Sequence, residues 1–245
     1  MDNFQKDKKR VKIIQSFIDG YWETDDKKYQ YIYKGEIILF LGPMFSGKSK
    51  QLANMMGVAR LGGLQTYAIQ LSMSDRKEDI LKDEQAIKIF DMVKDDRNYI
   101  LSRSGESFPC NNIEYLLEDD IINDCLNVDV IGIDEGQFCE DLALFCRMMC
   151  KLGKTIYVAA LNSDKLQKQW PNITEIMPYA TDVKYTKEYA ICKGCPHANG
   201  KVVHAPYTTL KSGLDLYGKQ IYTGSENYKA VCEQCLDDRI KEEYY

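Results

Sequence analysis

Residues 42–49, GPMFSGKS, have the spacing of a loop that binds the phosphates of a nucleotide. Gly42 and Gly47 permit backbone angles that turn successive N–H groups toward a phosphate, and a helix start adds positive potential. Lys48 can reach the β- and γ-phosphates, and the Ser49 hydroxyl can bind Mg²⁺. The alternative, an ordinary glycine turn, is disfavoured because an apolar run precedes the loop and a helical pattern follows it. The expected nucleotide-binding residues are Gly42, Pro43, Met44, Phe45, Ser46, Gly47, Lys48 and Ser49.

Asp134 and Glu135 follow an apolar run in the stretch VDVIGIDEGQF, residues 128–138. Proteins built on parallel sheets place ligands at such strand ends. Asp134 would then hold Mg²⁺ through water, and Glu135 could take a proton from an attacking hydroxyl or water. The alternative is that the two carboxylates cap a following helix. The presence of the phosphate loop favours the catalytic interpretation.

Four of the nine cysteines form two CxxC pairs, Cys192 with Cys195 and Cys232 with Cys235. Two such pairs are typical of a tetrahedral Zn²⁺ site. A segment this short has little core of its own, so zinc would contribute about 10–16 kcal/mol of apparent binding free energy to its folding. We therefore expect a structural site. A redox dithiol is the alternative.

The remaining thiols show no paired spacing, and we expect no catalytic cysteine among them. Cys139, Cys146 and Cys150 are predicted to share one face of a helix, where free cysteine packs as a small hydrophobic residue. The only two histidines, His197 and His204, are expected to be ordinary surface residues rather than metal ligands.

Apolar runs rich in β-branched residues occur at 36–42, 65–71, 128–134 and 154–161. Segments long enough for helices separate them, and a helix is expected over 49–60. This alternation predicts an α/β fold with a parallel sheet flanked by helices. It would place the phosphate loop and the acidic pair at strand ends.

The chain of 245 residues can bury one good core and a small second module. We expect an N-terminal extension of uncertain order at 1–34, a nucleotide-binding domain at 35–185, and a small cysteine-bearing domain with the C-terminal tail at 186–245. A net charge of −5 provides no broad positive field for a polynucleotide. No apolar run suits a membrane span or secretory signal, so a cytoplasmic protein without a membrane partner is expected.

Several of these stretches together resemble the type II thymidine kinases, the thymidine kinase 1-like group. GPMFSGKS, IDEGQF, YVAAL, the two CxxC pairs and YTGSENYKAVC occur in that family's order, and the resemblance spans 35–236. It implies transfer of the ATP γ-phosphate to the 5′-hydroxyl of thymidine or deoxyuridine, giving dTMP from thymidine for the salvage of DNA precursors. It also implies a RecA-like P-loop domain, a zinc domain with a lasso loop that covers the substrate, and a homotetramer.

The resemblance also assigns roles to individual residues. Lys48, Ser49 and Asp134 match the phosphate and Mg²⁺ positions, Glu135 matches the catalytic base, and Arg76 matches the arginine near the reacting oxygen. Gln137 joins the nucleotide-binding set. The residues matching the nucleoside pocket are Met44, Phe138, Leu161, Trp170, Thr208 and Tyr228, with the lasso backbone of Gln220, Ile221, Tyr222, Thr223 and Gly224.

Four positions depart from the family pattern. Ser74 stands where the family has an aspartate near the arginine, which puts the metal surroundings in doubt. An ungapped match places Lys165 where the family has an aromatic side chain that stacks on the base, so one stacking side chain is missing. Cys139 replaces a phenylalanine and Leu210 a basic residue. These changes suggest weak substrate affinity.

Two other classes of protein remain open. A zinc-bearing P-loop ATPase acting on nucleic acid would also carry these motifs, but it should present a basic, aromatic-rich groove. A non-catalytic relative, acting as a binding module, fits the changes at Ser74 and Lys165. It does not fit the intact Lys48 and Glu135.

Overall fold

The computed structural model describes residues 34–71, 115–186, 190–218, 222 and 225–244, with Cys110 and Ile113, and the backbone of four short β-segments at 21–23, 28–30, 98–101 and 107–113. Within the expected N-terminal extension, the described part is an antiparallel pair, β1 (Tyr21–Glu23) and β2 (Lys28–Gln30).

A seven-stranded sheet forms the centre of the main domain, in the order β5-β6-β4-β7-β8-β3-β9. Neighbouring strands are parallel except for the edge pair β5 and β6, which is antiparallel. The apolar runs identified in the sequence form the four central strands. The strands are β3 (Glu36–Gly42), β4 (Thr66–Leu71), β5 (Asn98–Leu101), β6 (Ser107–Ile113), β7 (Val130–Asp134), β8 (Thr155–Leu161) and β9 (Asp182–Tyr185).

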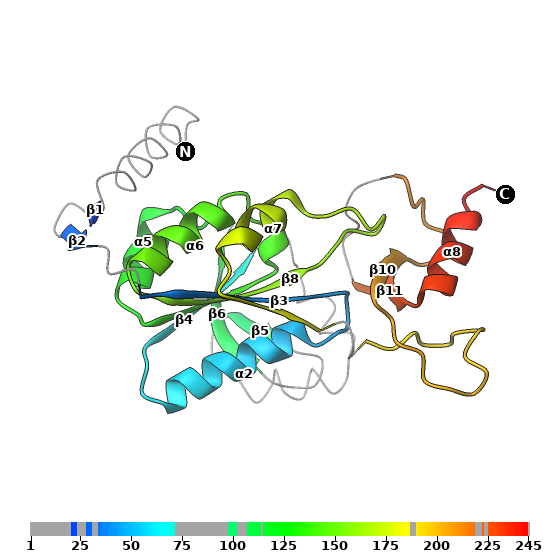
Figure 1. Cartoon of the computed structure of the whole chain (residues 1–245), viewed down its shortest axis with the longest axis horizontal. Helices are drawn as coiled ribbons and strands as arrows, with labels where there is room; N and C mark the ends of the chain where they lie inside the picture. The colour runs from blue at the N-terminus through cyan, green and yellow to red at the C-terminus, as the bar shows by residue number, and fades with distance from the viewer. Residues whose placement is uncertain are drawn as a thin grey trace.

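Helices cover both faces of this sheet (Figure 1). α2 (Lys48–Leu61) packs on one face through Leu52, Ala53 and Met56. The opposite face carries α5 (Asp119–Leu126), α6 (Leu142–Lys151) and α7 (Pro171–Ile176), followed by a short 3₁₀ turn, η2 (Met177–Tyr179). The apolar stripes of α5 and α6 pack against β3, β7 and β8 to form the larger hydrophobic cluster. The expected α/β fold is therefore confirmed.

The parallel register brings three strand ends to one edge of the sheet. Gly42 at the end of β3 pairs with Leu161 at the end of β8. Asp134 at the end of β7 pairs with Ala159, two residues before the end of β8. β8 lies between β3 and β7, so the phosphate loop and the acidic pair flank the end of one shared strand.

The C-terminal part lies beyond the end of the sheet (Figure 1) and has its own small core. β10 (Tyr207–Leu210) pairs antiparallel with β11 (Tyr228–Val231), and a 3₁₀ turn, η4 (Ser225–Asn227), precedes β11. α8 (Glu233–Lys241) follows and packs on β10. The domain limits at 34/35 and 185/186 remain predictions. Among the described helices, none is long and apolar enough to cross a membrane.

One expectation about the thiols was wrong. Cys139 does not share a helix with Cys146 and Cys150, because it ends the turn η1 (Gly136–Phe138) and α6 begins three residues later. Asp141 explains this, since its carboxylate accepts hydrogen bonds from the Cys139 thiol and from the backbone N–H groups of Leu116 and Leu117.

Gly136 allows η1 to pack directly on β8. A Cβ added there would lie 2.6 Å from Val158 Cγ1. We expect Gly136→Ala to destabilise the protein by about 1–3 kcal/mol through overpacking. In urea unfolding, adding Val158→Ala should give a double variant less destabilised than the sum of the two single variants, because the clashing methyl is gone.

Gly57, in the interior of α2, provides the control. No atom lies within 4 Å of a Cβ added there, so Gly57→Ala should leave the stability unchanged or raise it slightly. If the losses of stability in Gly136→Ala and Val158→Ala simply add in the double variant, the contact between residue 136 and the Val158 side chain does not limit the packing.

Candidate functional site

The phosphate loop runs from the end of β3 to the start of α2, as the motif predicts. Gly47 has a φ of 88° and Phe45 a φ of 64°, so the loop turns through two left-handed residues before the helix starts. The Lys48 ammonium donates a 2.6 Å hydrogen bond to the carbonyl of Pro43, which folds the lysine over its own loop. The buried Ser46 hydroxyl lies 2.6 Å from that of Thr186, which follows β9.

Ser49 and Asp134 meet at the sheet edge, where a metal ion would be needed. The Ser49 hydroxyl donates a 3.0 Å hydrogen bond to Asp134 Oδ1, and Asp134 is buried. A hydroxyl and a carboxylate oxygen are ligands that suit Mg²⁺. The two residues, 85 positions apart, therefore fit the expected metal site.

Glu135 is held in a fixed position beside this pair. Its φ of 59° is left-handed, and its N–H donates to Asp134 Oδ1 at 3.1 Å. The amide nitrogen of buried Gln137 donates to Glu135 Oε2 at 2.6 Å, and its amide oxygen accepts from Leu161 N at 2.9 Å. Gln137, expected to bind nucleotide, thus positions the carboxylate of Glu135 in this structure.

Asn172, at the start of α7, fixes the same turn, and the sequence analysis missed it. Its amide nitrogen lies 2.6 Å from the carbonyl of Gln137, 2.7 Å from that of Cys139 and 3.2 Å from that of Gly136. No motif marks this residue, because its partners lie more than 30 positions earlier in the chain. Only the packing of α7 beside η1 reveals it.

Thr208, on β10, joins the C-terminal part to the phosphate loop. Its hydroxyl accepts a 2.7 Å hydrogen bond from Met44 N, and its carbonyl accepts one of 2.8 Å from the side-chain amide of Gln167. Met44 and Thr208, both predicted to lie at the nucleoside pocket, are thus brought together across 164 positions. Gln167 is a second residue that the sequence analysis missed.

Phe138 and Trp170, both predicted pocket residues, form an edge-to-face pair with centroids 5.6 Å apart. Trp170 is buried, and its indole N–H has no hydrogen-bond partner in the part of the chain that is described. Tyr228 lies at the start of β11, where its hydroxyl accepts a 2.9 Å hydrogen bond from Tyr222 N. Burial raises the pKa of Tyr228 above its usual value.

Several predicted residues lie outside the described part of the chain, and their roles stay predictions. They are Ser74 and Arg76, and the lasso residues Gln220, Ile221, Thr223 and Gly224.

The two CxxC pairs converge on one point. The sulfur atoms of Cys192, Cys195, Cys232 and Cys235 all lie within 4.8 Å of one another. Cys195 Sγ lies 3.6 Å from Cys235 Sγ and 3.7 Å from Cys232 Sγ. These separations exceed a disulfide bond, and they match the edge of about 3.8 Å that four Zn–S bonds of about 2.3 Å would give a tetrahedron.

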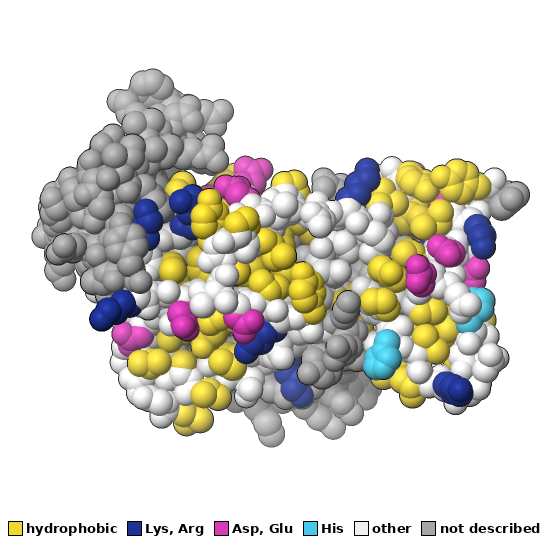
Figure 2. All heavy atoms as spheres, in the orientation of Figure 1, with side chains coloured by type: hydrophobic (Ala, Val, Ile, Leu, Met, Phe, Trp, Pro, Cys, Tyr) yellow, Lys and Arg dark blue, Asp and Glu magenta, His cyan; other side chains and the backbone are white. Residues whose placement is uncertain are grey.

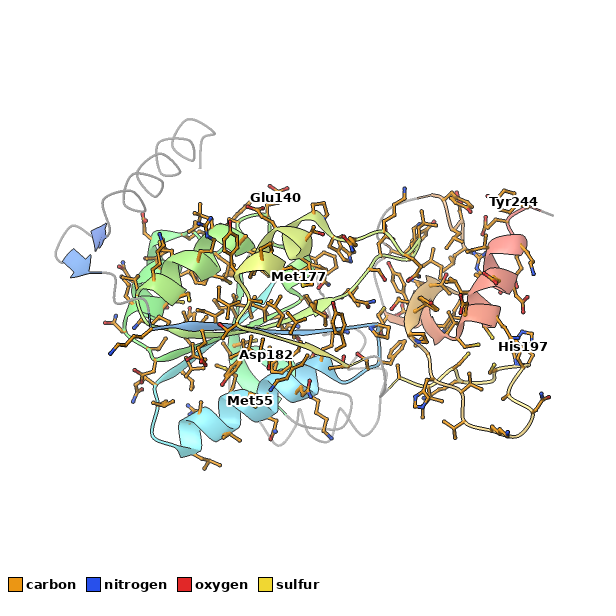
Figure 3. All side chains as sticks on the ribbon, in the orientation of Figure 1. Met55, Glu140, Met177, Asp182, His197 and Tyr244 are labelled. Carbon is orange, nitrogen blue, oxygen red and sulfur yellow. The ribbon has the colours of Figure 1, made fainter. Side chains whose placement is uncertain are left out.

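Neither histidine belongs to this cluster. His197, labelled in Figure 3, has its Nε2 2.7 Å from a carboxylate oxygen of Asp238 on α8. His204 forms a backbone bridge with Ile191. The four sulfur atoms therefore make the ligand set that a structural zinc would use.

The thiols outside the cluster have the properties of packing residues. Burial raises the pKa of Cys139, and the neighbouring Asp141 carboxylate raises it further. Burial also raises the pKa of Cys125 and of Cys146. A thiol that stays protonated is a poor nucleophile, which agrees with the absence of a predicted catalytic cysteine.

The phosphate loop after β3 and the acidic pair at the end of β7 define a P-loop nucleotide-binding protein. Its four-cysteine cluster could hold a metal ion. The family model "Thymidine kinase" matches residues 35–236, which is most of the chain. The chain belongs to the thymidine kinase family and is therefore a kinase.

Thymidine kinases from distant sources align over most of their own length. The thymidine kinase of Rabbit fibroma virus (strain Kasza) is 32% identical over 204 residues, 83% of this chain and 97% of the viral protein. "Thymidine kinase, cytosolic" of Bos taurus is 33% identical, over 82% of this chain and 72% of the bovine protein. "Thymidine kinase 1" of Dictyostelium discoideum is 30% identical, over 83% and 78%.

The cysteine cluster gives a direct prediction. Purified protein should carry about one zinc per chain, measured by elemental analysis. Cys232→Ser should lose most of this zinc and weaken nucleoside binding more than ATP binding, because the cluster folds the part that carries β10 and β11.

Cys150→Ser is the matched control, since it removes a half-buried thiol of α6 outside the cluster and should keep the zinc. Folded, active protein without zinc would contradict the assignment.

Proposed function

We propose that this protein is an ATP-dependent thymidine kinase, which transfers the γ-phosphate of ATP to the 5′-hydroxyl of thymidine and deoxyuridine. The observation that carries the proposal is the meeting of Ser49, Asp134 and Glu135 at one sheet edge, in a chain of the thymidine kinase family. Phosphoryl transfer needs a phosphate cradle, a metal and a group that takes the hydroxyl proton. The phosphate loop with Lys48 would supply the cradle, Ser49 and Asp134 the metal ligands, and Glu135 the proton acceptor.

The phosphate loop would hold the donor nucleotide. Backbone N–H groups at the start of α2 bind phosphate oxygens, and the Lys48 ammonium exchanges the Pro43 carbonyl for the β- and γ-phosphates. Ser49 and Asp134 would hold Mg²⁺, which neutralises charge on the phosphates. The 3.0 Å hydrogen bond between Ser49 and Asp134 supports this, because it brings the two side chains together.

Glu135 would act as the general base. Gln137 holds one carboxylate oxygen through its amide, while Leu161 N fixes the other end of that amide. This support keeps the carboxylate oriented, so that it can take the proton as the 5′-oxygen attacks. Asn172 braces the backbone of the same turn through three carbonyls.

The nucleoside would bind between this edge and the C-terminal part. Support comes from the placement of Thr208 on Met44 and from the aromatic pair of Phe138 with Trp170. The buried indole N–H of Trp170 is a donor that a ligand oxygen could satisfy. Arg76, from the family resemblance, would approach the reacting phosphate.

We further propose a structural zinc at the four cysteines, a homotetramer and a cytoplasmic role in the salvage of DNA precursors. The sulfur geometry supports the zinc. The family resemblance supports the tetramer and the role, and the name of the bovine relative, "cytosolic", supports the location.

A nucleic-acid-linked ATPase is the competing function. On the face in Figure 2, the described basic side chains lie singly or in small groups among acidic ones rather than in one stripe. Together with the net charge of −5, this favours a small substrate over a polynucleotide. ATP consumption stimulated by thymidine but not by single-stranded DNA would separate the two.

The first test of the mechanism is Glu135→Gln. Glutamine keeps the shape and can still accept the Gln137 hydrogen bond, but it cannot take the proton. Turnover should fall about 10²- to 10⁴-fold while ATP affinity stays nearly the same, measured by steady-state kinetics and calorimetry.

Glu140→Gln, at an exposed position five residues later, should leave turnover unchanged. Near-normal turnover in Glu135→Gln would show that Glu135 is not the general base.

A second test is a phosphorylation assay across the natural deoxynucleosides. Thymine presents acceptor, donor and acceptor to main-chain groups of the lasso, whereas cytosine reverses two of these. Each buried unpaired polar group costs about 1–3 kcal/mol, so deoxycytidine should be excluded by a factor of about hundreds or more. Equal use of deoxycytidine would refute base recognition by the lasso backbone.

A further inference from the structure

Lys165 is a buried lysine in the loop that joins β8 to α7. Only 4% of its surface is exposed, although lysine is almost never buried without a partner. Its ammonium lies 5.0 Å from the ring centroid of Tyr222, within the range of a cation–π contact. Tyr222 belongs to the segment between β10 and β11, more than 50 positions later.

Tyr222 links this contact to the expected nucleoside pocket. Its backbone N–H donates a 2.9 Å hydrogen bond to the Tyr228 hydroxyl, and its own hydroxyl donates one of 2.9 Å to the carbonyl of Asp215. Lys165 therefore contacts a residue that is hydrogen-bonded to both arms of the segment, at Asp215 and at Tyr228.

The base of the same segment is fixed from the other side by α8. The buried Arg239 guanidinium donates hydrogen bonds to the carbonyls of Leu210 and Leu214 and pairs with Glu243 at 2.6 Å. The Glu243 carboxylate also accepts from Leu216 N at 3.2 Å. These contacts hold residues 210–216 against α8, and Lys165 contacts the same segment further along, at Tyr222.

The charges around Lys165 suit an ammonium. Burial lowers the pKa of Lys165 below its usual value, and Arg239 lowers it further. The carboxylates of Asp215, Asp164 and Glu243 act in the opposite direction. Three acidic groups, from the loop, the segment and the turn after α8, therefore favour the cation that the Tyr222 ring attracts.

We propose that Lys165 is a positioning residue for nucleoside binding, whose ammonium fastens Tyr222, and through it Tyr228, to the loop after β8. This inference rests on the proposed function, because it takes Tyr228 as part of the nucleoside pocket. In place of an aromatic ring that stacks on the base, Lys165 would then provide a contact that fixes Tyr222 and Tyr228 before the nucleoside binds. A preordered segment lowers the entropic cost of binding.

A double-mutant cycle tests the contact. Lys165→Leu removes the charge at nearly constant volume, and Tyr222→Leu removes the ring. Each should raise the KM for thymidine about 3- to 30-fold, the range expected of a desolvated cation–π contact, with kcat and the KM for ATP within about twofold. The double variant should be no weaker than the weaker single variant, because both changes break one contact.

Lys165→Arg should keep the thymidine KM within about threefold, since guanidinium also binds an aromatic face. Lys168→Leu is the matched control, an exposed lysine of the same loop, and should have no effect. Strictly additive losses in the double variant, or an unchanged KM in Lys165→Leu, would overturn the proposal.

Limited trypsin digestion without nucleoside provides a readout that does not depend on activity. If Lys165 fastens the segment, Lys165→Leu should be cleaved at least about fivefold faster between residues 211 and 229 than the native chain, with an unchanged midpoint of thermal unfolding. If Lys165→Leu is cleaved faster but the native protein does not phosphorylate thymidine, the proposed function is refuted while the contact between Lys165 and Tyr222 is supported. Unchanged cleavage would refute the contact whatever the substrate is.

Discussion

Parallel pairing of β8 with both β3 and β7 is the constraint on which the site depends. It sets Gly42 opposite Leu161 and Asp134 opposite Ala159, so the ends of three strands lie at one edge. Ser49 can reach Asp134 only because of this alignment. A slip by one residue would turn every side chain of a strand to the opposite face, and the buried apolar residues of β3, β7 and β8 prevent it.

The polar groups of this edge are supported in a chain of contacts. Glu135 has a left-handed backbone, a conformation that costs free energy in a residue other than glycine. Gln137, Leu161 and Asn172 hold the surrounding turn through hydrogen bonds that are partly buried. Each broken link would leave a polar group unpaired away from water, so the turn is held in one conformation.

The sequence predicted what depends on local spacing. The phosphate loop, the acidic pair and the CxxC pairs each lie within a few residues of one another, and the apolar runs located the four central strands. What it could not show were partners far apart in the chain. Asn172 contacts Gln137 from 35 positions away, and Lys165 looked like the loss of a stacking side chain until Tyr222 was seen to lie against it. Cys139 was misplaced because its spacing matched a helix, whereas Asp141 binds its thiol ahead of α6.

The cysteine cluster and the phosphate loop are connected by a short path. Cys232 directly follows β11, whose Ala230 pairs with Thr208 on β10, and the Thr208 hydroxyl accepts from Met44 N in the phosphate loop. The bond to Met44 is one hydrogen bond, worth about 0.5–1.5 kcal/mol, so its loss would weaken nucleotide binding about two- to tenfold. Tyr222 and Tyr228 belong entirely to the segment that the cluster folds. Damage to the cluster should therefore affect the proposed nucleoside pocket first and nucleotide binding second, because Tyr222 and Tyr228 of that pocket belong to the segment, whereas the phosphate loop only contacts it.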